Sequence, residues 1–201
     1  MIIYFVIFIF VIFLVFFIMV WIRKTLWDAV HRNLLDFEDY YKGRVGRRNI
    51  FNPPVFSGKI DSVAVTINFS SAREQNRRVN YINLSMESDS PVSFSIVGKE
   101  WLKIQDAGPL EDFLTLENDK GKAFILRPVS KKSVKKIAQL KEVKELLNIC
   151  EDMSYIYFGP TGILFEQESA ELLKDTEHET LIKKIMQIIK LGRKINEYKN
   201  S

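Results

Sequence analysis

The sequence predicts an α+β fold, with an antiparallel sheet of about five to seven strands and segregated helices, preceded by one transmembrane helix. Three patterns predict this arrangement. The first 22 residues carry no charged side chain. Several later segments alternate apolar and polar residues between short polar turns, which is typical of an antiparallel sheet with one buried face. Helical spacing of apolar residues is confined to other segments. A small β-barrel capped by the C-terminal helix is the alternative architecture.

The N-terminal segment, residues 1–22, consists mostly of Ile, Val, Phe and Leu and lacks Gly and Pro. A helix of this length spans about 33 Å, enough to cross a hydrocarbon core of about 30 Å. No basic residue precedes the segment and no small-residue cleavage site ends it, so the pattern favours an uncleaved anchor over a signal peptide. Trp21 and Trp27 fit an aromatic belt at the membrane interface.

Basic residues follow the anchor, whereas only the α-amino group precedes it. The positive-inside rule then predicts a single-pass protein of the cell membrane, with its N-terminus outside and its C-terminal domain in the cytoplasm. A single cysteine, Cys150, is compatible with that reducing compartment. Anionic lipid headgroups are expected to contact five basic residues near the anchor: Arg23, Lys24, Arg44, Arg47 and Arg48.

Residues 23–49 are expected to form a juxtamembrane helix and a basic linker. Apolar residues spaced by three and four predict a helix over 25–41, and they are Leu26, Val30, Leu34, Phe37 and Tyr41. The following residues, 42–49, include two glycines and four basic residues, and Asn52-Pro53-Pro54 excludes a helix. We therefore place the cytoplasmic α+β domain at residues 50–201.

Strict alternation predicts a strand over residues 61–69, with its apolar side chains on one face. The polar run 70–78 predicts a loop. Two further strands follow, one with Ile82, Leu84 and Met86 on a face and one with Val92, Phe94 and Ile96. Turn residues predict two hairpins, which join 113–117 to 122–127 and 153–158 to 163–167.

Two helices complete the expected domain. One begins at Ser130 or Ser133 and ends near Ile149. The other is the C-terminal helix, for which Thr176 and Glu179 have the spacing of a capping box.

This order of elements resembles a loose group of uncharacterised single-span prokaryotic membrane proteins. The resemblance lies in the anchor, in Phe56-Ser57-Gly58-Lys59-Ile60 opening a strand pair, in the Gly-Pro and Asp-Phe step over 108–113, and in the helix around 141–147. The group often has Thr-Gly-Asp where this chain has Ala107-Gly108-Pro109. The resemblance implies the architecture of an N-terminal anchor with an α+β domain, and it implies no activity.

The sequence contains no recognisable catalytic, cofactor or metal motif. His31 and His178 lie far apart and have no second ligand at a recognised spacing. Cys150 follows an apolar helix end, which is typical of a small buried side chain. The glycines are scattered, so no phosphate-binding loop is predicted. We therefore expect no cofactor, no metal ion and no catalytic residue.

The same two helices carry clusters of basic residues, which we interpret first as solvated polar faces. They lack interleaved aromatic residues, which disfavours nucleic-acid binding. The first cluster is Lys131, Lys132, Lys135 and Lys136, and the second is Lys183, Lys184, Lys190, Arg193, Lys194 and Lys199.

These observations predict an anchored binding or scaffold module for an unidentified protein partner or for anionic headgroups. A membrane-tethered enzyme without a recognisable motif is the alternative. A subunit that oligomerises through residues 1–22 is less favoured, because small residues at four-residue spacing are missing there. Neither the oligomeric state nor the identity of a partner follows from the sequence.

Overall fold

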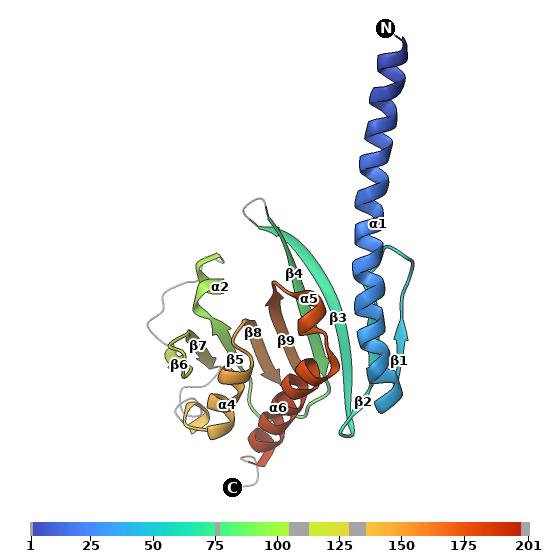
Figure 1. Ribbon diagram of the computed structural model, residues 1–201. Helices are drawn as coiled ribbons and strands as arrows, with labels where there is room; N and C mark the ends of the chain where they lie inside the picture. The colour runs from blue at the N-terminus through green and yellow to red at the C-terminus, as the bar shows by residue number, and fades with distance from the viewer. Residues whose placement is uncertain (1, 75–76, 105–112, 129–135, 198–201) are drawn as a thin grey trace.

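The structure is a computed structural model, and it describes residues 2–74, 77–104, 113–128 and 136–197. Figure 1 shows a long N-terminal helix that leaves a sheet-and-helix body, with the chain ends at opposite ends of the molecule. The arrangement confirms the predicted α+β class. Some of the residues discussed above lie outside the described ranges. They are residues 108–112 of the Gly-Pro and Asp-Phe step, the two serines proposed to begin a helix (Ser130 and Ser133), and four of the clustered lysines (Lys131, Lys132, Lys135 and Lys199).

Helix α1, Ile2–Tyr40, is continuous from the apolar segment into the body. Its apolar residues up to Ile22 are exposed except for Val20, which is partly covered. Its second half is buried at Trp27, Val30, Leu34 and Phe37. The spacing of three and four residues places these four side chains on one face, as the sequence predicted for the segment 25–41. The same helix therefore forms both the exposed apolar segment and part of the core.

Within the described residues, nine antiparallel strands form one sheet, in the order β1-β2-β3-β4-β9-β8-β5-β7-β6. The sheet is therefore larger than the five to seven strands expected. Strands β1 and β6 are its two edges, so the sheet is open and not the barrel considered as an alternative. The strands are β1 Lys42–Gly46, β2 Val55–Ile60, β3 Val63–Glu74, β4 Arg77–Met86, β5 Phe94–Gly98, β6 Leu114–Glu117, β7 Ala123–Pro128, β8 Met153–Gly159 and β9 Gly162–Ser169.

Strand β1 occupies most of the segment that we expected to be a basic linker. Gly43 faces Gly58 of β2, and a Cβ atom on either glycine would come within 3 Å of the Phe56 ring. The two glycines thus let the Phe56 ring cover the strand pair, where it contacts the Phe37 ring at 5.7 Å between centroids. Glycine here serves close packing and not chain flexibility.

The polar run 70–78, expected as a loop, extends strands β3 and β4 instead. Residues Ser70–Glu74 pair with Arg77–Tyr81 in unbroken register. Sequence alternation did not reveal this extension because, apart from the buried Tyr81, the paired residues have little apolar surface to bury.

In the described part of the chain, the helical segments that cover one face of the sheet include the second half of α1, α4 (Lys141–Ile149), α5 (Leu172–Asp175) and α6 (His178–Glu197). Thr176, which we expected to cap the last helix, closes α5, since its hydroxyl donates to the Leu172 carbonyl at 2.7 Å. The opposite face has a small cluster of Val97, Leu102 and Ile125 under α2 (Lys99–Ile104).

Truncating the buried face of α1 should destabilise the whole domain. We expect Leu34→Ala to lower the free energy of unfolding by about 2–5 kcal/mol, because Leu34 is fully buried against the sheet. The neighbouring Leu35 is 38% exposed, so Leu35→Ala is the matched control and should change it by less than about 1 kcal/mol. Urea unfolding of the full chain in lipid nanodiscs measures both, and equal effects would contradict the packing of α1.

Candidate membrane-facing surface and cavity

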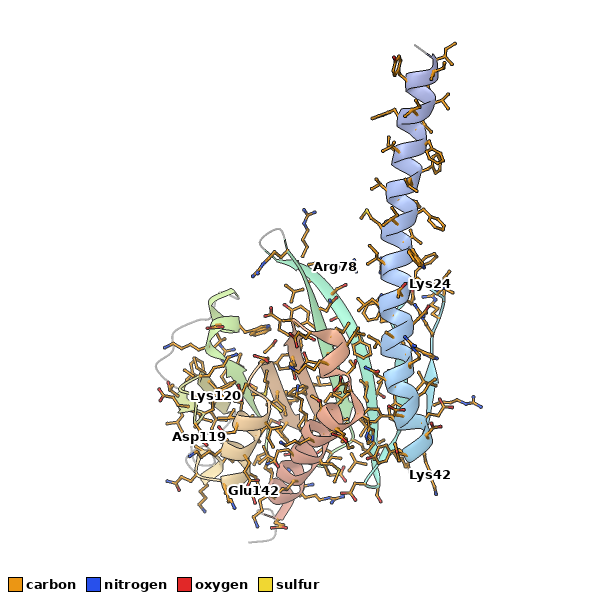
Figure 2. All side chains as sticks on the ribbon, in the orientation of Figure 1. Lys24, Lys42, Arg78, Asp119, Lys120 and Glu142 are labelled. Carbon is orange, nitrogen blue, oxygen red and sulfur yellow. The ribbon has the colours of Figure 1, made fainter. Side chains whose placement is uncertain are left out.

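The apolar half of α1 is the one helix in the described part of the chain that is long and apolar enough to cross a membrane. This half of the helix extends away from the body (Figure 1), and its side chains stand on all sides of it (Figure 2). Trp21 at its end is 61% exposed and fits the interfacial position expected for it. Trp27 does not, since it is buried and packs against the Phe69 ring with centroids 6.0 Å apart. The body therefore begins within about one and a half helical turns of the end of the apolar segment.

The five basic residues predicted to contact headgroups do not form one group. Arg23 and Lys24 are exposed directly after the apolar segment, and Arg48 is exposed in the loop between β1 and β2. Arg44 is the middle residue of β1, and Lys42 in the same strand lies far along α1 from Lys24 in Figure 2. Only part of the predicted set is therefore close to the apolar helix.

Arg47 has a structural role that the sequence did not reveal. Its guanidinium donates to Asp28 Oδ1 at 2.5 Å and to the Asn52 carbonyl at 2.6 Å, and it also donates to the Ile50 carbonyl. Only 13% of its side chain is exposed. These bonds hold the β1–β2 loop, residues 47–54, against α1 just beyond its apolar half.

The β1–β2 loop also carries exposed apolar side chains. Ile50 is 53% exposed and Phe51 is 41% exposed, next to the charged Arg48. Asn49 accepts hydrogen bonds from the backbone amides of Phe51 and Asn52 through its Oδ1 atom, which fixes the turn that presents them. Exposed apolar side chains beside basic residues suit the boundary between lipid headgroups and acyl chains.

A cavity of about 570 Å³ lies where β4 begins and β9 ends, between α2 and α5. Tyr81 and Trp101 provide its aromatic surface. Trp101 also contacts the Tyr155 ring at 5.7 Å, and burial, with the Glu166 carboxylate second, raises the pKa of Tyr155. The remaining lining is charged, and carboxylates outnumber basic groups: Glu100, Asp152, Glu168, Glu171 and Asp175 against Arg77, Lys122 and Lys174. This balance favours polar or cationic groups over anions.

A buried polar cluster adjoins the cavity through Asp175. Lys184, placed on the solvated face of the last helix by its sequence pattern, is instead only 7% exposed. Its ammonium donates to Gln167 Oε1 at 2.8 Å and lies 3.8 Å from Asp175 Oδ1. The Ser169 hydroxyl donates to Asp175 Oδ2 at 2.7 Å. The cluster joins β9 to α5 and α6 and satisfies a charge that would otherwise be costly to bury.

The exposed basic residues of α6 are mostly paired with acids. Lys190 lies 2.7 Å from Glu145 and Arg193 lies 2.6 Å from Asp61. The hydrogen bond from Lys190 is the main cause that lowers the pKa of Glu145. Because α6 ends near the C-terminus, at the end of the body away from the apolar half of α1 (Figure 1), this helix face is not part of the candidate membrane-facing surface.

The two histidines and the cysteine do not come together as a site. Within the described ranges, no three His, Cys, Asp or Glu side chains lie close enough to hold a metal ion. His178 packs between the rings of Phe37 and Tyr40, with centroids 4.9 and 4.8 Å away. Cys150 is buried, and burial raises the pKa of its thiol to about 12. Its sequence pattern predicted a buried side chain, and the structure confirms it.

Comparison with known proteins gives little further information. No family model matches the chain, and no curated protein matches it. Among solved structures, it is similar to the crystal structure of the mycobacterial trehalose monomycolate transport factor A, TtfA. The two are 13% identical, the alignment covers 84% of this chain and 92% of that chain, and the TM-score is 0.47. A likeness at this level carries no argument about function.

Cys150 should be inert toward thiol reagents in the folded protein. The thiolate is the reactive species, and a pKa of about 12 leaves almost none at pH 8. We expect no reaction of the native full chain with a chromogenic disulfide reagent and one equivalent of reaction after unfolding in guanidinium. Because the chain has one cysteine, the signal has a single source. Rapid labelling of the native protein would contradict the burial.

Removing the buried ammonium should destabilise the domain. We expect Lys184→Met to lower the free energy of unfolding by about 1–3 kcal/mol, because Gln167 and Asp175 lose their donor. Lys183→Met is the matched control, since Lys183 is exposed on the same helix. Thermal unfolding of both variants measures the difference, and an unchanged Lys184→Met would show that this cluster contributes nothing.

Proposed function

We propose that the chain is a single-span membrane protein whose α+β domain is held at the cytoplasmic leaflet as a binding or scaffold module. The observation that carries this proposal is the continuity of α1. One helix has an exposed apolar half and a second half buried in the domain core, with Ile22 and the first buried residue, Trp27, only five residues apart. The domain is thus attached to the proposed span without a flexible linker.

A rigid attachment supports a binding role because it confines the domain in both position and orientation. A partner at the same membrane then meets a high effective concentration of one preferred surface, so that modest intrinsic affinity is sufficient. The basic residues support a cytoplasmic position, since Arg23 and Lys24 follow the apolar segment directly.

The membrane-facing surface supports contact with anionic headgroups. Of the five predicted residues, Arg23, Lys24 and Arg48 are exposed near the apolar helix, and each contributes about 1 kcal/mol if it reaches the headgroups. Arg47 acts indirectly, by holding the loop that presents Ile50 and Phe51. Arg44 lies farther along the body and has no part in this contact.

A membrane-tethered enzyme is the second candidate, and the cavity favours it. Carboxylates from α2, β9 and the turn before β8 meet there beside Tyr81 and Trp101. The same cavity suits a binding module equally, because pairs such as Lys122 and Asp152, 3.5 Å apart, hold its charges within the protein. We place the binding role first for that reason.

The orientation can be tested by accessibility of single cysteines in a Cys150→Ala background. We expect Ser57→Cys, exposed in β2, to react with a membrane-impermeant maleimide only after the cells are permeabilised. Tyr4→Cys, near the other end of α1, is the control and should react in intact cells. Labelling of Ser57→Cys in intact cells would place the domain outside and overturn the cytoplasmic assignment.

The binding role can be tested by placing a photo-crosslinking amino acid at Trp101, on the cavity. In native membranes we expect a discrete crosslinked protein from this position and none from Lys183, which is exposed on α6 away from the cavity. A small-molecule adduct without any protein adduct would favour the enzyme. Equal crosslinking at both positions would indicate random collision.

A further inference from the structure

Strands β3 and β4 extend beyond their neighbours in the sheet. Strand β2 pairs with β3 only as far as Ile67, and β9 pairs with β4 only from Asn80 onward. Beyond those points the two strands pair only with each other. We refer to residues 70–74 and 77–79 as the β3–β4 ribbon, and Figure 1 shows it pointing the same way as the apolar half of α1.

The ribbon has almost no apolar surface of its own. Residues 70–73, 77 and 78 are exposed, and Val79 is only partly covered. A two-stranded ribbon of this kind is at best marginally stable in water, because it buries little apolar surface. Its extension from the sheet therefore adds little to the core.

Two arginines share one face of the ribbon. Arg73 and Arg78 are directly opposite each other in the register, so their side chains leave the same face. The Arg78 guanidinium donates to the Ser71 hydroxyl at 2.9 Å, which keeps it on this face. Two guanidinium groups on one exposed face suit the oxygens of a phosphate group.

The arginine pair lies on the same side of the sheet as the helices. Phe69, two residues before Ser71, faces that side and contacts Trp27 of α1. From this contact, the four residues to Arg73 rise about 13 Å along β3. The five residues from Trp27 back to Ile22 rise about 7.5 Å along α1. A ribbon that leans somewhat from the helix axis therefore still brings Arg73 level with the end of the apolar segment. Figure 2 labels Arg78 and Lys24 at this same end of the domain.

We propose that the β3–β4 ribbon is a second membrane contact, in which Arg73 and Arg78 bind phosphate groups of anionic lipids. This inference rests on the proposed function, because it requires residues 1–22 to span the membrane. Each basic residue at an anionic surface strengthens the contact about fivefold. With the β1–β2 loop on another side of α1, the ribbon gives the domain two contacts and prevents its rotation about the anchor.

The test follows a fluorophore on the ribbon of the full chain. In the Cys150→Ala background, Ala72→Cys carries the probe, since Ala72 is exposed and its side chain leaves the face opposite the arginine pair. The protein is placed in nanodiscs that contain headgroup spin-labelled lipid, with or without phosphatidylserine. We expect quenching at least twofold stronger in the anionic nanodiscs, and a decrease when salt is raised to about 1 M, where the screening length is about 3 Å.

Matched variants assign the effect to the arginines. The double change Arg73→Gln and Arg78→Gln should reduce quenching to the level of zwitterionic nanodiscs. The control double change, Lys42→Gln and Lys183→Gln, removes the same charge at exposed positions away from the ribbon and should leave quenching unchanged. Equal loss in both double variants, or quenching that does not depend on lipid charge, would overturn the role of the arginines.

Further probes separate this inference from the proposed function. A probe at Ile50→Cys reports the β1–β2 loop. Quenching at Ile50 without quenching at Ala72 would overturn the ribbon contact alone, whereas loss at both would count against the anchored geometry as well. Inorganic phosphate or an RNA oligonucleotide is added to zwitterionic nanodiscs in a last arm. A probe response there equal to that of phosphatidylserine would assign the arginines to a soluble phosphate ligand and overturn the lipid assignment.

Discussion

The packing of one helix face against one sheet is the constraint on which this structure depends. Val30, Leu34 and Phe37 are fully buried, and the Phe37 ring contacts Phe56, which in turn covers the paired glycines of β1 and β2. Apolar burial of this kind stabilises a domain whether or not a membrane is present. Because the same helix continues into the apolar segment, the core also sets the direction in which that segment leaves the domain.

Two largely buried cations connect elements around this core. Arg47 connects a loop to α1 through Asp28 and two carbonyls, and Lys184 connects β9 to α5 and α6. Both are cations that their sequence neighbourhoods present as surface residues. Each is instead a structural link, and each lies beside a feature to which we assign a role, the β1–β2 loop and the cavity.

Sequence patterns predicted those elements that bury an apolar face. The alternation through Phe69, the two later hairpins, the face of α1 over 25–41 and the burial of Cys150 all follow from that physics. The patterns failed where pairing serves no burial. Strand β1 has Lys42 and Arg44 on one side and only Gly43 and Val45 on the other, and the outer part of β3 and β4 has only Ala72 and Val79 as apolar residues.

The candidate site was less predictable than the fold. Arg23 and Lys24 could be placed because they adjoin the apolar segment in the chain. The local sequence does not encode the tertiary pairing that places the other arginines. That pairing positions Arg48, joins Arg47 to Asp28, and sets Arg73 opposite Arg78. Trp27 was misplaced for a related reason, since an aromatic ring near an anchor is equally suited to an interface or to a core.

The absence of a joint between the apolar half of α1 and its buried half has a mechanical consequence. A membrane-spanning helix adapts to a thinner bilayer by tilting. Here a tilt of α1 would swing the entire body through the same angle, lowering one flank toward the lipid and lifting the other. The orientation of the domain relative to the membrane would then change with bilayer thickness, because the 39 residues of α1 form one continuous helix.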